Sequence, residues 1–339
     1  MTIAHEAPVT ASAAVETRTM AAALNRALAD ALDADPSVLV FGEDVGALGG
    51  VFRVTDGLAA RFGEQRVFDT PLAESGIVGA AVGMAMNGMR PVVEMQFDAF
   101  AFPAFQQIVS HVAKMANRTR GSLRMPIVIR IPFGGGIGGV EHHCDSSEAY
   151  YAHTPGLTVV APSTPQDAYS LLRAAIESPD PVIFLEHKKL YWSKAPVDTA
   201  VATGIGRAAV VRDGTDATLI AYGASVATAM QAAEIAASEG RSLQVVDVRT
   251  LTPFDDETVC AAVRSTGRAV VIAEAPGFAS VASEIAARVG ERCFEHLEAP
   301  VRRVTGFDTP FAPPKLERFY LPDADRILDA VDTLNWDES

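Results

Sequence analysis

The chain has 339 residues, of which 49% are hydrophobic and 21% are charged. At roughly 150 residues per domain, this length predicts two domains, each with its own hydrophobic core, and excludes a fibrous or disordered chain. Lys and Arg number 28 against 42 Asp and Glu, which gives a net charge of −14. Such a surface disfavours binding to nucleic acid and to anionic membranes.

The cysteines and the N-terminal residues indicate the cellular location of the protein. Three widely spaced cysteines include no Cys-x-x-Cys pair, so we expect neither a disulfide framework nor a structural zinc site, and we expect a reducing, cytoplasmic location. Residues 1–18 lack the features of a secretory signal or a transit peptide and predict a flexible, solvated arm. The least charged stretches, 76–89 and 217–233, are too short and too broken by Gly to span a membrane.

The first domain is expected over residues 19–186. Apolar residues recur with helical spacing from Met20 to Leu32, and Pro36 ends the pattern. Runs rich in Val, Ile and Leu then alternate with segments of helical periodicity. We expect strands at residues 37–42, 91–97, 125–132, 157–162 and 181–186, and helices beginning at 74, 102 and 164. This alternation predicts an α/β domain with a mostly parallel sheet covered on both faces.

Residues 187–206 lose this periodicity and carry the densest group of lysines, which predicts a linker. A second α/β domain is expected over residues 207–339. Its strands are expected at 216–223, 242–248 and 268–275, and its helices at 224–240, 254–267 and 278–290, each ending in or beside a Gly. Two doubly wound α/β domains of unequal size are therefore the predicted architecture.

A glycine-rich loop follows the strand at 125–132. Gly134, Gly136 and Gly139 satisfy the spacing of a dinucleotide-binding loop. Such a site needs the third Gly to open an apolar helix and an acid about 20 residues later, and the sequence has neither. We expect instead a close-packed active-site loop whose backbone approaches a ligand or a partner chain. A nicotinamide oxidoreductase stays as an alternative that the missing acid disfavours.

His142 and His143 follow this loop, and Asp145 to Glu148 resemble a capping box that begins a helix. Because neighbouring residues at a helix entrance point in different directions, at most one of the two imidazoles is expected to face a given pocket. The alternative is that both histidines are structural. No further ligands with metal-site spacing accompany them, so metal binding is not expected.

Acidic residues stand at two further places where open α/β sheets bind ligands. Glu74 begins an otherwise apolar helix and is either an acid favoured by the helix dipole or a carboxylate that hydrogen-bonds a heterocycle and exchanges protons. Glu43 and Asp44 follow the strand at 37–42 and are either solvated or part of a site. In the aromatic stretch 96–105, Phe100 suits either the core or stacking on a planar ring.

Several segments together resemble the beta subunit of thiamin diphosphate-dependent 2-oxoacid dehydrogenases. They include FGEDV, VFDTPLAESGIVGAAVGMA, EMQFDAFAFPAFQQI, HHCDSSEAYYAHTPGLTVVAPSTPQDA, PVIFLEHKKLY and VRRVTGFDTPF, and they follow the family order from about residue 19 to 322. The resemblance implies a transketolase-like pyrimidine-binding domain followed by a transketolase C-terminal-type domain. It also implies an assembly of two alpha and two beta chains that decarboxylates a 2-oxoacid and acylates a lipoyl group.

The resemblance also assigns residues. Glu74 matches the family's glutamate that hydrogen-bonds the aminopyrimidine ring, where a carboxyl can exchange a proton with the ring nitrogen. His143 matches the active-site histidine that contacts the substrate carboxylate, the intermediate or the incoming lipoyl group. Leu72, Gln96 and Phe100 fall where the family lines the pyrimidine pocket. Phe100 replaces a Tyr found in some relatives, which preserves ring stacking and removes a phenolic hydrogen bond.

The family often holds a structural potassium ion with backbone carbonyls. The corresponding carbonyls belong to Ile127, Ala175, Ser178 and Asp180, and relatives tend to have Asp and Asn in the turn that reads Ala175-Ile-Glu-Ser178-Pro-Asp180 here. Carbonyl donation would survive those changes.

The family's magnesium and diphosphate motif, Gly-Asp-Gly followed by Asn residues, is missing here. The resemblance therefore implies that an alpha subunit holds magnesium and the diphosphate, and that this chain supplies half of a shared thiamin diphosphate site. The other implied partners are a lipoyl-bearing acyltransferase component and a small 2-oxoacid. QFDAFAFPAFQQI, DTPF and FYLPD look closest to the branched-chain (2-oxoisovalerate) members, and the pyruvate and acetoin dehydrogenases remain alternatives. A silent scaffold that docks the acyltransferase core is an alternative of another class, which the intact Glu74 and His143 disfavour.

Overall fold

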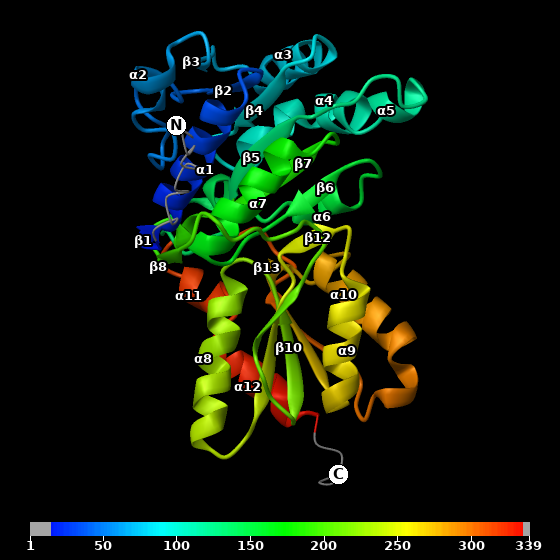
Figure 1. Ribbon diagram of the computed structural model, residues 1–339. Helices are drawn as coiled ribbons and strands as arrows, with labels where there is room; N and C mark the ends of the chain where they lie inside the picture. Colours follow the sequence, from blue (N-terminus) through cyan, green and yellow to red (C-terminus); the bar gives the residue numbers. More distant parts are fainter. Residues whose placement is uncertain (1–14, 335–339) are drawn as a thin grey trace, which may run out of the picture.

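The computed structural model describes residues 15–334, which form two α/β units stacked end to end (Figure 1). The first unit is built on a seven-stranded sheet with the order β12-β6-β7-β5-β4-β2-β3. All its neighbouring strands are parallel except β12 and β6. The strands are β2 (Val38–Gly42), β3 (Val67–Asp69), β4 (Arg90–Glu94), β5 (Val128–Phe133), β6 (Thr158–Val160), β7 (Val182–His187) and β12 (Thr250–Thr252).

Helices cover both faces of this sheet, as expected for a parallel sheet. On β5, Val128 packs in the core that contains α1 (Met20–Ala34) and α7 (Pro165–Glu177). Its neighbour Ile129 packs in the core that contains α3 (Glu74–Met86), because successive side chains of a strand point to opposite faces. The shorter helices are α2 (Leu58–Phe62), α4 (Phe105–Gln107), α5 (Met115–Arg118) and α6 (Glu148–Ala152).

The second unit contains a five-stranded sheet with the order β14-β13-β10-β11-β9, in which only β9 runs antiparallel. α8 and α12 pack together on one face, and α9 and α10 on the other. The strands are β9 (Ala209–Arg212), β10 (Ala217–Ala221), β11 (Leu243–Asp247), β13 (Ala269–Pro276) and β14 (Arg302–Gly306). The helices are α8 (Ser225–Ser238), α9 (Asp256–Thr266), α10 (Val281–Arg292), α11 (Glu317–Tyr320) and α12 (Ala324–Asp332).

The α/β class is confirmed, and several elements differ from the sequence predictions. Residues 16–18, expected in the flexible arm, belong to β1 (Glu16–Thr19), which pairs with β8 (Lys194–Val197) inside the expected linker. Residues 1–14 lie outside the described part of the chain. The helix expected from 102 is broken into a 3-10 turn (Ala99–Ala104), α4, a π turn (Ile108–Val112) and α5. Pro103 contributes to this break, because it lacks the N–H that a regular helix needs.

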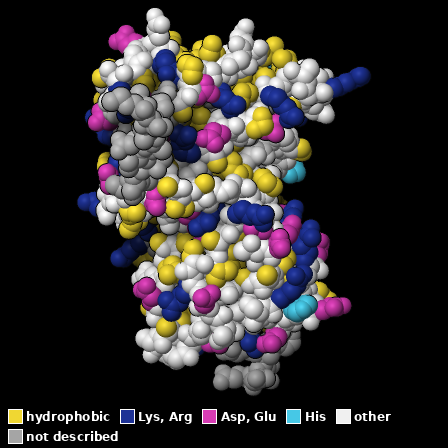
Figure 2. Space-filling model, in the orientation of Figure 1, with side chains coloured by type: hydrophobic (Ala, Val, Ile, Leu, Met, Phe, Trp, Pro, Cys, Tyr) yellow, Lys and Arg dark blue, Asp and Glu magenta, His cyan; other side chains and the backbone are white. Residues whose placement is uncertain are grey.

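The two units are joined by more than the linker. β12 belongs to the second half of the sequence but pairs with β6 of the first sheet. Buried polar contacts cross the same junction, where the Tyr222 hydroxyl donates to Glu148 at 2.7 Å and the His187 ring contacts Glu274 at 2.9 Å. On the face drawn in Figure 2, acidic and basic side chains are mixed over the second unit. The acidic side chains therefore form no single continuous negative patch on that face.

Candidate functional site

The candidate site lies at the carboxyl edge of the first sheet, where the strand order reverses. The chain passes from β2 to β3 on one side of β2, and later strands lie on its other side. Ligands of open α/β sheets bind at such a switch point. Here it gathers Glu43 and Asp44 after β2, Glu74 after β3 and Gln96 after β4. The Gln96 side chain donates to Asp44 at 2.8 Å and ties two of these loops together.

Glu74 and Glu43 form a buried pair of carboxyl groups. Glu74 is the first residue of α3, and the two side chains are only 8% and 7% exposed. Burial raises the pKa of Glu43 above its ordinary value, and the charges of Glu74 and Asp44 raise it further. Within the described chain, Glu43 Oε1 is buried without a hydrogen-bond partner. The unpartnered Glu43 oxygen is available to a bound ligand.

Aromatic rings surround His143 beside this edge. The centroids of Phe97 and His143 lie 4.3 Å apart with the rings edge to face, and Phe100 lies 5.4 Å from His143. Burial lowers the pKa of His143, and the nearby His142 and Lys188 charges lower it further, so the imidazole is neutral at neutral pH. The side chain of His142 is 47% exposed. His143 is thus half-buried and His142 is exposed.

The remaining predicted pocket residues take different positions. Phe100 lies on the 3-10 turn that packs against α3, so its ring and Glu74 belong to neighbouring elements. Gln96 is half-buried behind Asp44. Leu72 precedes α3 and is 80% exposed. The Leu72 side chain is therefore left largely uncovered by the residues that the structure describes.

The glycine-rich segment is a closed loop, which we call the glycine loop (residues 134–145). Its ends are joined by the bond from the Gly134 N–H to the Asp145 carbonyl at 2.8 Å. No long helix follows Gly139, because the next element is the 3-10 turn Glu141–His143. The amides of Gly135 and Gly136 bond to carboxylates of this chain. This geometry is not that of a dinucleotide loop.

The expected capping box after the glycine loop is wrong. α6 begins at Glu148, but the Ser147 side chain forms no cap. Instead, Asp98, which follows β4 in the same unit, accepts the Ser147 N–H at 2.9 Å and the Ser147 hydroxyl at 2.5 Å. Burial raises the pKa of Asp98 to about 7, although these Ser147 bonds and the Lys188 charge oppose the rise. The aromatic stretch and the histidine segment are thus fixed to each other.

A buried ion network under the site was not predicted. Arg130 on β5 donates two parallel bonds to Glu186 on β7, at 2.6 and 2.8 Å, and a third bond to Glu94 on β4. The Tyr191 hydroxyl donates to Glu186 at 2.7 Å. Although burial opposes the charge of Arg130, the two carboxylates hold its pKa above the ordinary value. The sequence pattern that could have predicted this network is the presence of charged residues within apolar strands. Charge-assisted hydrogen bonds are strong, so the network makes the base of the site rigid.

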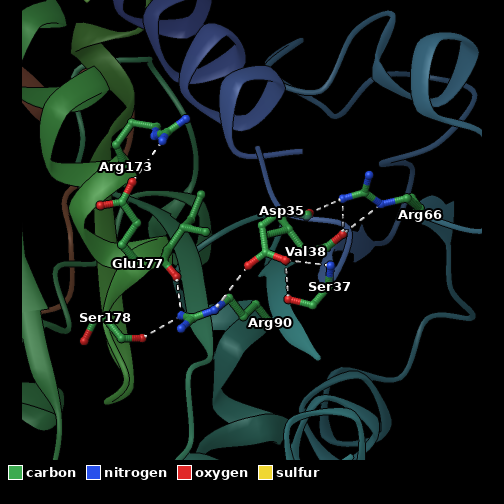
Figure 3. A network of polar contacts seen from close by, with 9 residues as sticks. Asp35, Ser37, Val38, Arg66, Arg90, Arg173, Glu177 and Ser178 are labelled. Carbon is green, nitrogen blue, oxygen red and sulfur yellow. Dashed lines mark hydrogen bonds and ion pairs between the residues drawn. The ribbon is translucent and has the colours of Figure 1, made fainter. Parts of the chain in front are cut away.

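The carbonyls predicted for potassium lie around the turn after α7, and each accepts a protein hydrogen bond. Ser178 accepts from the Arg90 guanidinium at 3.1 Å (Figure 3), Ala175 from the Ser178 N–H and Asp180 from the Ser178 hydroxyl. The Ile127 carbonyl accepts an N–H of β7 at 2.9 Å. A carbonyl oxygen has two lone pairs. Each of these carbonyl oxygens could therefore bind a monovalent cation only with the lone pair that its hydrogen bond leaves free. The cation would also lie beside the positive charge of Arg90.

Two further features concern metals and membranes. Among residues 15–334, no three His, Cys, Asp or Glu side chains are grouped in a way that could hold a metal ion. Within the same residues, no helix combines the length and the apolar character needed to cross a membrane.

Comparison with known proteins agrees with this architecture. Residues 16–193 match the family described as "Transketolase, pyrimidine binding domain", and residues 206–327 match "Transketolase, C-terminal domain". A solved structure described as "Split gene transketolase, inactive beta4 tetramer" superposes with a TM-score of 0.77 over 93% of this chain and 97% of its own. Its sequence identity is 24%, so it supports the fold alone.

Two curated relatives align over nearly the whole chain. The "Pyruvate dehydrogenase E1 component subunit beta" of Leifsonia xyli is 60% identical, over 94% of this chain and 95% of the relative. The "3-methyl-2-oxobutanoate dehydrogenase subunit beta" of Mycobacterium tuberculosis is 53% identical, over 96% and 94%. The sequence motifs looked closer to the branched-chain members, yet of these two relatives the pyruvate one has the higher identity. The preferred 2-oxoacid is therefore not settled by similarity.

Proposed function

Because the chain belongs to the family of 2-oxoacid dehydrogenase E1 beta subunits, we propose that it supplies half of a thiamin diphosphate site completed by an alpha subunit. The proposed reaction is the oxidative decarboxylation of a branched-chain 2-oxoacid, followed by reductive acylation of a lipoyl group on an acyltransferase component. The observation that carries the proposal is the buried Glu43 and Glu74 pair at the switch point, with one unpartnered oxygen.

The residues present fit the pyrimidine end of the cofactor. When bound, thiamin diphosphate supplies the electron sink that decarboxylation of a 2-oxoacid requires. Glu74 would face a ring nitrogen and exchange a proton with it, and the Glu43 carboxyl, whose pKa is raised by burial and by the Glu74 charge, lies beside it. Phe100 would stack on the ring, and Gln96 and Leu72 would line its edge. In this position Glu74 would act as acid and base toward the ring.

His143 would act on the substrate side of the same site. Its neutral imidazole can donate one hydrogen bond and accept another. Phe97 and Phe100 limit its rotation and exclude water from one side of the ring. It would therefore donate to the substrate carboxylate or to the incoming lipoyl group without adding a positive charge.

The missing half of the site is assigned to the alpha subunit, which would hold magnesium and the diphosphate. The outer side of α3 supports this assignment. After Glu74 the helix contains no charged residue, and a Cβ placed on Gly83 would meet no atom of the described chain. Leu72, Met86 and Met89 are exposed nearby. An uncharged helix face of small residues suits close packing against another chain.

The reconstituted enzyme tests this function. The chain is combined with its alpha subunit and a lipoyl-bearing acyltransferase, and kcat/KM is measured for 3-methyl-2-oxobutanoate and for pyruvate. We expect the branched-chain acid to be preferred by about tenfold or more, the size of effect that extra methyl groups produce in an apolar pocket. A preference for pyruvate would favour the second candidate, which the 60% identical relative supports. No turnover of any 2-oxoacid would refute the proposal.

Potassium at the turn after α7 and a cytoplasmic location are parts of the same proposal. Carbonyl oxygens suit a hard monovalent cation, and the cysteines at 144, 260 and 293 are buried and free. We expect the melting temperature to rise when NaCl is replaced by KCl at equal ionic strength, because a bound ion stabilises the folded state. Equal melting temperatures in the two salts would remove potassium from the proposal.

A further inference from the structure

The glycine loop carries His143, whose ring packs against Phe97 and Phe100, but the loop itself has little regular secondary structure. Its outgoing limb, residues 134–138, belongs to no helix or strand, and its return limb contains only a short 3-10 turn. The two limbs touch each other, since a Cβ placed on Gly139 would lie 3.3 Å from the His143 Cβ and 3.0 Å from the Cys144 sulfur. Whatever fixes the outgoing limb therefore also fixes the histidine.

Side chains of the second unit hold the outgoing limb. One carboxylate oxygen of Glu317 accepts the Gly136 N–H at 2.7 Å, and the other accepts the Gly138 N–H at 3.2 Å. Glu274 accepts the Gly135 N–H and also bonds to His187. Three amides of the loop thus end on two carboxylates that are 139 to 181 residues away in sequence.

The backbone of the loop is shaped for these anions. Gly134, Gly136 and Gly138 have φ values of +78°, +82° and +67°, which L side chains rarely adopt. Alternation of such residues with ordinary ones turns successive N–H groups toward one point, and the resulting nest binds anions. In this chain the anion is the carboxylate of Glu317. The bonds are charge-assisted and therefore stronger than neutral ones.

Packing reinforces the same contact. A Cβ on Gly135 would clash with the Phe311 ring, so this ring lies directly on the loop. Phe311 and Tyr320 also form a small buried cluster with Cys144, the residue after His143. Glu317 lies between these two aromatic residues in sequence, and its carboxylate accepts the loop amides.

We propose that Glu317 is a positioning residue, whose carboxylate fixes the glycine loop and thereby orients His143 for the reaction proposed above, on which its catalytic consequence rests. The second unit then contributes to the active site through the backbone of the first unit, without touching substrate or cofactor. Glu274 completes the contact at the base of the loop.

The test compares Glu317→Ala and Glu317→Gln with Glu295→Ala in the full chain assembled with its alpha subunit. Glu295 is an exposed glutamate of the same unit and is the matched control. Amide hydrogen exchange is followed by mass spectrometry in fragments covering residues 134–143. We expect about 10- to 100-fold faster exchange in Glu317→Ala, the factor that corresponds to loss of a hydrogen bond to a charged group. Glu317→Gln should be intermediate, because it keeps one neutral acceptor, and Glu295→Ala should match wild type.

Activity provides the second readout. We expect kcat for lipoyl acylation to fall roughly 10- to 100-fold in Glu317→Ala with the KM for the 2-oxoacid unchanged, because a misplaced catalytic group slows the chemical step. Unchanged exchange in both Glu317 variants would overturn the proposal, and so would faster exchange with wild-type kcat. If the wild-type assembly turns over no 2-oxoacid, the proposed function is refuted, while the exchange rates still decide whether Glu317 holds the loop.

Discussion

Replacing Glu74 by Gln separates catalysis from helix capping, because the two roles predict opposite results. Gln keeps the size and much of the local hydrogen bonding but cannot exchange a proton with a ring nitrogen. If Glu74 were only an acid favoured by the dipole of α3, its replacement would cost about 0.3 to 1 kcal/mol and leave turnover nearly intact. If it holds the catalytic proton, turnover should fall about 10²- to 10⁴-fold.

The buried partner of Glu74 sharpens the stability side of this prediction. Burial is the larger cause of the raised Glu43 pKa, and the Glu74 charge adds to it. A group whose pKa is raised in the folded protein makes its whole contribution to stability below the pKa that it has in the unfolded chain. That contribution is lost as the pH rises through its pKa in the folded protein. Glu74→Gln removes one cause of that loss. The melting temperature of the variant minus that of wild type should therefore increase as the pH is raised from about 4 to 8.

The assay is proton exchange at the thiazolium carbon of bound cofactor, in the assembly with the alpha subunit, for wild type and Glu74→Gln. Melting curves at several pH values accompany it. We expect the exchange rate to fall with turnover, while the melting temperature changes by no more than about 2 to 4 °C. A variant with unchanged exchange and turnover would return Glu74 to a structural role and remove it from the proposed mechanism.

Three further predictions concern the rest of the site. His143→Ala should lose most lipoyl acylation with its melting curve intact, whereas His142→Ala should be mild because that imidazole is exposed. Equal losses in reconstituted enzyme would contradict this assignment. The chain alone should not bind thiamin diphosphate tightly, since the diphosphate ligands are absent; tight magnesium-dependent binding in a calorimetric titration would refute that. Ala80→Glu on the outer side of α3 should block assembly with the alpha subunit at an unchanged melting temperature, as measured by analytical ultracentrifugation, and normal assembly would show that this face is free.

The elements that the sequence predicted well are those whose signal is local. α1 has helical apolar spacing, a Thr19 cap and a terminating proline, and β5 is an apolar run between turn residues, so both were found. β1 was missed because its residues, ETRT, are polar and its stability comes from pairing with β8 about 180 residues away. β12 was missed for the same reason, since it pairs with a strand of the other unit.

The same distinction applies to the site. Glu74, Phe100 and His143 were assigned through the segments that resemble the family, and their roles stay predictions. The closeness of Glu43 to Glu74 was not predicted, because it depends on the order of strands in the sheet. The broken segment after Phe100 was predicted as one helix, since its apolar spacing is helical, and only the tertiary structure introduces the π turn. Local sequence patterns thus do not show which residues distant in the sequence come into contact.

Buried polar atoms without a partner in the described residues are found at several places, and the switch point is one of them. Two of those in the described residues, Glu43 Oε1 and Thr70 Oγ1, follow the adjacent strands β2 and β3 at the switch point. Leaving a buried polar group unpaired costs about 1 to 3 kcal/mol, so such groups persist mainly where a ligand, a water or a partner satisfies them. The guanidinium of Arg130, under the site, is instead bonded to Glu94 and Glu186 of this chain. The contrast between a completed base and an incomplete rim is the arrangement expected of half an active site.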